Sequence, residues 1–184
     1  ALMGTAYAKA AGVKDPRVGL VTNGTEDHKG DPLHQEAHNL LKTLPGIHFV
    51  GNVEGRDIMG GDIDVAVCDG FSGNVALKTT EGTALALMQI IKQNIMASFW
   101  AKVGYALFMK KAFKNIKRVM DYSKYGGAVL LGIDKVVVKS HGSSKAESIC
   151  ASVLQAKDAA ASGLISSIKE LLASSDLEAI GAEG

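Results

Sequence analysis

One glycine-rich segment, CDGFSGNVALK at residues 68–78, has the residue types of an anion-binding site. Its glycines would let the backbone approach a ligand closely and point amide groups at it. A helix beginning near residue 75 would add the positive end of its dipole. Lys78, about one turn into that helix, would contribute a full positive charge. The candidate phosphate- or substrate-binding residues of this segment are Gly70, Ser72, Gly73 and Asn74.

Asp69 stands beside these glycines and is poorly placed for direct contact with phosphate. Its carboxylate could orient Lys78 or a hydroxyl group, or act as a base. The alternative for the whole segment is a tight turn in which Asn74 caps the following helix. The local pattern leaves both interpretations open.

A second candidate, SHGSSK at residues 140–145, joins a β-branched strand to a long helix. Ser143 or Ser144 could cap that helix, and both hydroxyl groups could also donate to phosphate oxygens. His141 could donate to an oxyanion or transfer a proton. The alternative is an ordinary solvated loop histidine.

A third loop, at residues 23–30, is too acidic to cradle phosphate by itself. It could form one wall of a cleft with Lys29 facing the ligand, or be a solvated turn. His34 and His38 would share a helix face, but the sequence offers no convincing third zinc ligand, so both are expected to be structural or solvated. Neither a metal site nor a cofactor-binding motif is predicted.

The elements that must position these loops form three strand–loop–helix units. Strands are expected at 17–22, 47–50, 64–68 and 136–139, and helices at about 32–43, 75–97 and 146–173. Near-continuous apolar strands alternating with helices predict an α/β fold with a mostly parallel sheet. The carboxyl ends of parallel neighbours share one edge, so the three loops are expected to gather there.

Composition narrows the function classes. The 184 residues carry a formal net charge of only +1, so nucleic acid is not an expected partner. No apolar run is long enough to span a membrane. Cys68 and Cys150 lie far apart, which suggests free thiols and fits a cytoplasmic protein. The first residues read as the middle of a helix, so the chain is expected to be a fragment, with 175–184 as a tail.

The segment 82–120 contains no Asp or Glu and half of the ten aromatic residues. It predicts a basic amphipathic helical protrusion that could meet an anionic membrane surface or an acidic protein. The alternative is a surface helix whose apolar face joins the core. The residues proposed for this surface are Lys102, Phe108, Lys110, Lys111, Phe113, Lys114, Lys117 and Arg118.

Four ordered blocks together resemble the PlsX family of phosphate acyltransferases. They are the glycine loop within 17–30, the DGFSGNV run with its continuation to residue 82, the YSKYGGA run at 122–128, and HGSS at 141–144. The resemblance covers nearly the whole chain, although family members are longer at the N-terminus. It implies that residues 1–174 are the C-terminal part of one α/β catalytic unit.

The family's fold is three-layered and resembles that of the isocitrate and isopropylmalate dehydrogenases, and its members are dimers. The implied reaction transfers a fatty acyl group from acyl carrier protein to inorganic phosphate, and the acyl phosphate enters phospholipid synthesis. Peripheral association with the membrane is implied as well. Acyl carrier protein is acidic, so the lysine-rich segment suits its docking.

This reaction needs phosphate held against a thioester carbonyl and a stabilised tetrahedral oxyanion. The 70–74 loop, Ser143 and Ser144 are expected to hold phosphate, Lys78 and His141 to stabilise charge, and Asp69 to orient a group or act as base. Two other functions stay open: a phosphotransacetylase-like transferase that uses acyl-CoA, and a non-catalytic module that binds acyl groups or membranes.

Overall fold

The computed structural model describes residues 1–119, 126–142 and 144–175. The helices are α1 (Leu2–Ala10), α2 (Pro32–Thr43), α3 (Gly70–Ala97), α4 (Phe99–Gly104), α5 (Lys110–Val119), α6 (Ala146–Ala161) and α7 (Leu164–Ser174), with a 3-10 turn at Asp57–Met59 and a π-helical turn at Tyr105–Met109. The strands are β1 (Arg17–Val21), β2 (His48–Val53), β3 (Val65–Val67), β4 (Ala128–Leu130) and β5 (Val137–Lys139).

A three-stranded parallel sheet of order β2-β1-β3 confirms the predicted α/β class. Its central strand, β1, is buried over Val18, Gly19 and Leu20, as expected for a parallel strand covered on both faces. A side chain at Gly19 would lie 2.7 Å from Val53 of β2, so the close packing here requires glycine. The sheet therefore has a tightly packed middle strand that positions the loops at its ends.

The strand expected at 136–139 exists as β5, but its predicted placement as a parallel neighbour is wrong. It pairs antiparallel with β4 in a separate two-stranded sheet. The two strands are joined by only six residues, and Gly132 in this connection has a positive φ of 85°. A short connection of this kind can reverse the chain but cannot make the crossover that parallel pairing needs.

The long helix expected at 146–173 is also divided, into α6 and α7. Gly163 lies between them in the left-handed conformation, where glycine commonly ends a helix. The turn lets α7 fold onto α1 around Ala6, Ala159, Leu164 and Ile168. A side chain at Gly4 would lie 2.6 Å from Val65, so α1 also packs closely on β3. Helix α1 thus joins the two sheets.

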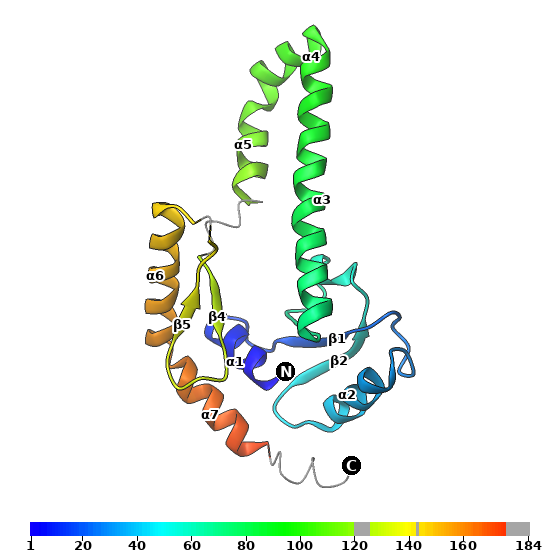
Figure 1. Cartoon of the computed structure of the whole chain (residues 1–184), viewed down its shortest axis with the longest axis vertical. Helices are drawn as coiled ribbons and strands as arrows, with labels where there is room; N and C mark the ends of the chain where they lie inside the picture. The colour runs from blue at the N-terminus through cyan, green and yellow to red at the C-terminus, as the bar shows by residue number, and fades with distance from the viewer. Residues whose placement is uncertain (120–125, 143, 176–184) are drawn as a thin grey trace.

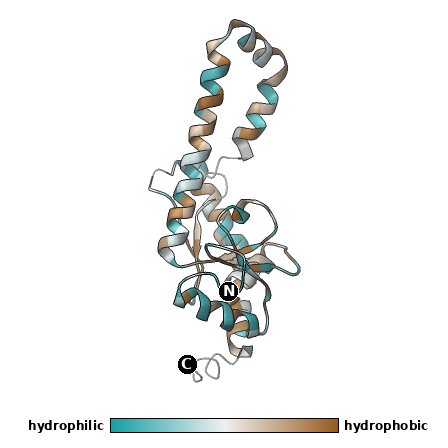
Figure 2. Ribbon diagram, turned by 90° about the vertical axis from the view of Figure 1, so that its right-hand side faces the viewer, coloured by the Kyte–Doolittle hydropathy of each residue, from teal (hydrophilic) through white to brown (hydrophobic). Residues whose placement is uncertain are grey.

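Helices α3, α4 and α5 form a hairpin that extends away from both sheets (Figure 1). None of the residues of α3 or α4 is buried. Apolar residues recur along the hairpin in Figure 2, and Leu85, Trp100 and Phe108 are 68%, 79% and 83% exposed. Across the described parts of the chain, no helix is both long and apolar enough to pass through a membrane.

Candidate functional site

The parallel sheet brings two of the three candidate loops to one edge. Strands β1 and β3 run in the same direction as neighbours, so the 22–31 loop and the start of α3 both leave their carboxyl ends. The 140–145 segment follows β5 in the other sheet and leads into α6 (Figure 1). The expected gathering of three loops at one parallel edge is therefore wrong for the third.

Asp69 caps helix α3. Its Oδ1 accepts hydrogen bonds from the amides of Phe71 at 2.8 Å and Ser72 at 2.9 Å. The helix consequently begins at Gly70, five residues earlier than predicted, and Asn74 is not its cap. Hydrogen bonds from the Ser72 side chain and backbone are the main reason that the pKa of Asp69 lies below its ordinary value.

This cap changes how an anion could meet the helix N-terminus. The Gly73 amide bonds to the carbonyl of Asp69 at 3.0 Å, so three amides of the first turn already have acceptors in Asp69. Gly70 is different, because a side chain added there would meet no atom within 4 Å. An anion at this end would approach over Gly70 and compete with, or displace, the Asp69 carboxylate.

Lys78 lies nine residues beyond Asp69, which is about 14 Å along the helix axis. Its ammonium forms an ion pair of 2.8 Å with Glu81, and its side chain is 53% exposed. The groups that donate to Asp69 Oδ1 are the backbone amides of Phe71 and Ser72. Lys78 belongs to the next turns of the helix and is held by an acidic neighbour.

The 22–31 loop is fixed by the side chain of Gln35 from α2 and by that of Asn23 within the loop. Gln35 donates to the carbonyls of His28 and Gly30 at 2.9 and 3.0 Å, and Asn23 accepts from the Gly30 amide at 3.0 Å. The half-buried Lys29 lies against Gly24, where an added side chain would be 2.9 Å from its Cγ. Lys29 is therefore held in a defined loop at the same sheet edge as Asp69.

His38 is a buried polar residue beneath this loop, with only 2% of its surface exposed. Its Nδ1 lies 2.8 Å from Asn52 Oδ1, while Asn52 Nδ2 donates to the carbonyl of Glu26 at 2.8 Å. The amide orientation of Asn52 makes His38 Nδ1 the donor. Among the described residues, His38 Nε2 has no hydrogen-bond partner, and it lies 3.6 Å from Asp27 Oδ1. Sequence reasoning treated His38 as structural or solvated and missed this network, since Asn52 is distant in the chain.

The 140–145 segment departs from its predicted role as a helix cap. Helix α6 is preceded by Lys145 at the cap position, with no capping hydrogen bond from a side chain, so Ser144 does not cap it. Ser144 instead donates its amide to the carbonyl of His141 at 2.9 Å. Ser143 lies outside the described residues, as does the 120–125 segment, and the side chains of Lys117 and Arg118 are likewise not described.

The diglycine at 126–127 packs against other elements of the protein. The Gly127 amide donates to Gln155 Oε1 at 2.9 Å. A side chain at Gly126 would lie 2.5 Å from Gln155, and one at Gly127 would lie 2.4 Å from the carbonyl of Lys139. Close approach to α6 and β5 therefore accounts for glycine at both positions.

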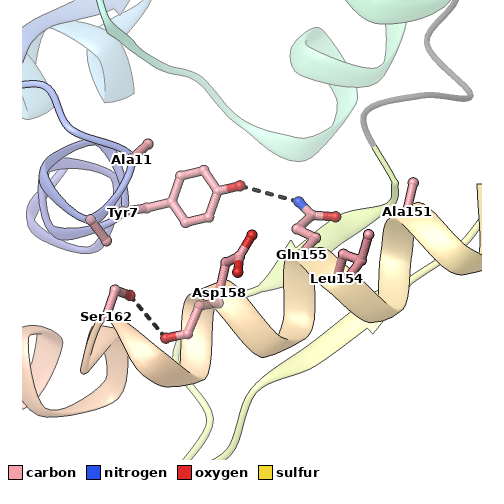
Figure 3. Close-up of a pocket in the computed structure, with 9 residues that line it drawn as sticks. Tyr7, Ala11, Ala151, Leu154, Gln155, Asp158 and Ser162 are labelled. Atoms are coloured by element: carbon pink, nitrogen blue, oxygen red, sulfur yellow. Dashed lines mark hydrogen bonds between the residues drawn. The ribbon is translucent and has the colours of Figure 1, made fainter.

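A pocket of about 360 Å³ lies between α1 and α6 (Figure 3). Tyr7 from α1 points toward Gln155 of α6, which donates to its hydroxyl at 3.2 Å, and Asp158 lies one turn farther along α6. The remaining lining is mostly alanine. No motif in the sequence indicated this pocket, because small residues on two distant helices carry no spacing signal. Among the described residues, no group of three His, Cys, Asp or Glu side chains is arranged to hold a metal ion.

Comparison with known proteins identifies the family to which this chain is similar. A family model described as fatty acid synthesis protein matches residues 1–167. Proteins named phosphate acyltransferase from Bacillus cytotoxicus and Bacillus cereus are 49% and 47% identical, over 94% and 97% of this chain and 52% and 54% of their own lengths. One from a Sulfurovum species is 49% identical over 92% of this chain and 51% of its own. The chain thus spans about half the length of the curated relatives it matches.

Proposed function

The chain belongs to the fatty acid synthesis protein family, and on this premise we propose that it forms part of an enzyme that transfers a fatty acyl group to inorganic phosphate. Membership of the family confirms the resemblance to PlsX-type proteins. The observation that carries the proposal is the sequence identity of 47–49% to phosphate acyltransferases over almost the whole chain. The acyl donor in this proposal is acyl carrier protein, and the complete fold is of the isocitrate and isopropylmalate dehydrogenase type.

The reaction requires one bond to form and one to break. A phosphate oxygen attacks the thioester carbonyl carbon, the C–S bond breaks, and the thiol leaves on the carrier protein after taking up the proton that phosphate loses. The product is an acyl phosphate. No covalent intermediate on the enzyme is needed, so the protein's task is to align the two substrates and stabilise the oxyanion.

We assign phosphate binding to the open side of Gly70 at the α3 N-terminus, with Lys29 on the neighbouring loop. In this proposal Asp69 polarises the Ser72 hydroxyl or accepts a proton from phosphate. Its lowered pKa keeps the carboxylate ionised, which both roles require, but also makes it a weaker base, so the first role is favoured. Lys78, His141, Ser143 and Ser144 are assigned to charge stabilisation and substrate holding. His141 and Ser144 act from the second sheet, so substrate would bridge the two sheets.

The hairpin is the proposed meeting surface for large partners: acyl carrier protein, an anionic membrane surface and a second copy in a homodimer. Its lysines suit the acidic carrier, and its exposed aromatic residues Phe99, Trp100 and Phe108 suit a peripheral membrane contact. The exposed apolar side chains of α3, which include Leu77, Leu85 and Ile90, suit a contact between two copies.

The activity is tested with the full-length protein and purified acyl carrier protein carrying a palmitoyl group. We expect acyl phosphate to form only when inorganic phosphate is present, and palmitoyl-CoA to be a much poorer donor. Equal turnover with palmitoyl-CoA would favour the phosphotransacetylase-like alternative. Binding of palmitate without any turnover would favour the non-catalytic module.

Asp69 is tested by Asp69→Asn and Asp69→Ala. Asparagine caps helices about as well as aspartate, so Asp69→Asn should keep the melting temperature while losing the charge. A base or a carboxylate that orients Ser72 predicts a fall in turnover of roughly 10²- to 10⁴-fold, with the acidic limb of the pH–rate profile lost. Full turnover in Asp69→Asn, together with a lower melting temperature in Asp69→Ala, would leave Asp69 a helix cap only.

A further inference from the structure

A buried hydrogen-bond network connects α2 and β2 to the loop that carries Lys29. His38 Nδ1 on α2 donates to Asn52 Oδ1 on β2 at 2.8 Å, and Asn52 Nδ2 donates to the carbonyl of Glu26 at 2.8 Å. The same carbonyl accepts the backbone amide of Lys29 at 3.0 Å. Three consecutive hydrogen bonds therefore lead from His38 to the backbone of Lys29.

Burial makes this network a stronger attachment of the loop than the neighbouring ion pair. His38 and Asn52 are 2% and 5% exposed, so water cannot replace a hydrogen bond that they lose. The ion pair between Lys42 of α2 and Asp27 of the loop is 2.9 Å long, but its side chains are 63% and 69% exposed. Exposed pairs of this kind contribute little to stability. The His38–Asn52 pair is therefore the better candidate to fix the loop in one arrangement.

The network lies at the sheet edge to which phosphate binding is assigned. Asn52 stands near the carboxyl end of β2, opposite Leu20 of β1, and both strands run parallel to β3, which leads to Asp69. The pKa of Asp69 is lowered chiefly by hydrogen bonds from Ser72, and His34 in the first turn of α2 is close enough to lower it further. A displacement of the loop against α2 would therefore change how Lys29 lies relative to the start of α3.

Asn52 has the one side chain type that can make both of its contacts. Its carboxamide accepts a hydrogen bond through Oδ1 while it donates through Nδ2. An aspartate would place a carboxylate oxygen against the carbonyl of Glu26, and a leucine could make neither bond. The donor at His38 Nδ1 fixes which way the carboxamide of Asn52 is turned.

The imidazole ring of His38 is itself fixed in place. It packs edge to face on Phe49 of β2, with ring centroids 5.3 Å apart and an angle of 71° between the planes. Its Nε2 lies 3.6 Å from Asp27 Oδ1, which is beyond hydrogen-bond range. The ring therefore reaches the loop through Nδ1 and Asn52.

We propose that His38 and Asn52 are positioning residues, which hold the carbonyl of Glu26 and through it the backbone of Lys29, so that the Lys29 ammonium meets phosphate at the edge of the sheet. The role of Lys29 in this inference rests on the proposed function. Both positioning side chains are buried, so they act through the loop and make no contact with phosphate.

The test measures the Kd for inorganic phosphate by calorimetry, with the full-length protein. His38→Leu and Asn52→Leu should each weaken phosphate binding roughly 5- to 100-fold, the range expected when a buried polar group loses its partner and the ligand must order the loop. In turnover assays the KM for phosphate should rise, while the KM for the palmitoyl carrier protein changes less than about twofold.

The conservative variant is His38→Asn, whose amide nitrogen can stand close to the position of Nδ1 and donate to Asn52. It should restore phosphate binding to within about threefold of the unmodified protein. Equal losses in His38→Asn and His38→Leu would overturn the proposal, because the hydrogen bond from Nδ1 would then be irrelevant to the loop.

Leu41→Ala is the matched control for damage to α2. Leu41 is the other buried residue of this helix, and its truncation lowers stability without removing a member of the network. The Kd for phosphate should change less than about twofold in this variant, provided that the protein stays folded at the assay temperature. A loss as large as that of His38→Leu would assign the effect to the packing of α2 and overturn the proposal.

A double-mutant cycle asks whether His38 acts through Lys29. Lys29→Gln removes the ammonium that the network is proposed to position. In that background His38→Leu should weaken phosphate binding by a further factor of less than about two, because there is no charge left to place. Independent, multiplicative losses from the two substitutions would overturn the proposal.

Hydrogen–deuterium exchange of the peptide covering residues 22–31 measures the loop without any reference to activity. His38→Leu should accelerate exchange in this peptide, and Leu41→Ala should accelerate it much less. If phosphate binding and exchange behave as described but no acyl phosphate is made, the positioning stands and the activity falls. If turnover is normal but His38→Leu changes neither phosphate binding nor exchange, the activity stands and the positioning is wrong.

Discussion

The two sheets and the helices packed on them, here called the base, differ from the helical hairpin of α3, α4 and α5 in how deeply their apolar side chains are buried. In the base, Val18, Leu20, Leu164 and Ile168 are at most 5% exposed. In the hairpin, α3 and α4 have no buried residue at all. The base therefore stabilises itself by burying apolar surface, whereas the hairpin presents such surface to something else.

The two regions also differ in how they hold polar groups. The base contains paired carboxylates and a buried histidine joined to Asn52. The part of the hairpin beyond Glu81, residues 82–119, contains lysines but no Asp or Glu to pair with them. A paired network fixes loops in one arrangement, which suits the alignment of small reactants. An unpaired basic and apolar surface suits recognition of larger or softer partners. Each of the following predictions would break or sharpen this contrast.

The largest effect is expected from removing a buried side chain in the base. Leu164 is 1% exposed in the cluster between α1, α6 and α7, so Leu164→Ala should lower the free energy of unfolding by roughly 2–5 kcal/mol. Leu85→Ala, on the exposed hairpin, should change it by no more than about 0.5 kcal/mol. Urea denaturation of the full-length protein measures both. A large loss in Leu85→Ala would show that a partner already covers the hairpin.

Acid should destabilise the base and leave the ionisation of the segment 82–120 unchanged. The pKa of Asp64 is lowered from 3.8 chiefly by its hydrogen bond from Arg17, and the pKa of Asp27 chiefly by that from Lys42. A carboxylate with a lowered folded pKa stabilises the protein above its unfolded pKa, and this is lost as pH falls through the folded pKa. The melting temperature should therefore decrease between about pH 4 and pH 2.

The control for this acid dependence is Arg17→Gln. It removes the ion pair at 2.9 Å and should make the decrease at low pH shallower, by a modest amount because both side chains are partly exposed. An unchanged pH dependence in Arg17→Gln would assign the acid sensitivity to other carboxylates. No such dependence can arise from the segment 82–120, which has no carboxylate side chain to protonate.

The smallest effect on stability is expected at the junction of the two regions. Gly70 begins α3 and has open space around it, so Gly70→Ala should raise the free energy of unfolding by about 0.4–1 kcal/mol. If substrate approaches over Gly70, the added methyl group should lower turnover although the protein is more stable. Gly73→Ala is a poor substitute, because its Cβ would lie 2.7 Å from Cys68 Sγ. A rise in both stability and turnover would remove Gly70 from the site.

The local elements of this protein were predictable from its sequence because short-range patterns decide them. The helix at 32–43 and the strands near 17–21 and 65–67 lie where apolar periodicity and loop residues placed them. The glycine-rich pattern after Val67 is likewise local, but it led to Asn74 being considered as the helix cap, whereas Asp69 is the cap. Asp69 competes with Asn74 for that role, and two amides in reach of its carboxylate decide the outcome.

Tertiary structure alone decided which elements pair and which surfaces remain open. Nothing in its local sequence distinguishes β5 from a parallel strand. Its antiparallel pairing with β4 puts β5 in a second sheet, and His141 and Ser144 follow it there. The His38–Asn52 contact joins residues 14 positions apart, and Gln155 of α6 reaches Tyr7 of α1, so both contacts depend on how the chain folds back. Residue types and spacing therefore determined the family, the α/β class and the basic hairpin segment, while long-range packing determined how the candidate residues are shared between two sheets and a helical hairpin.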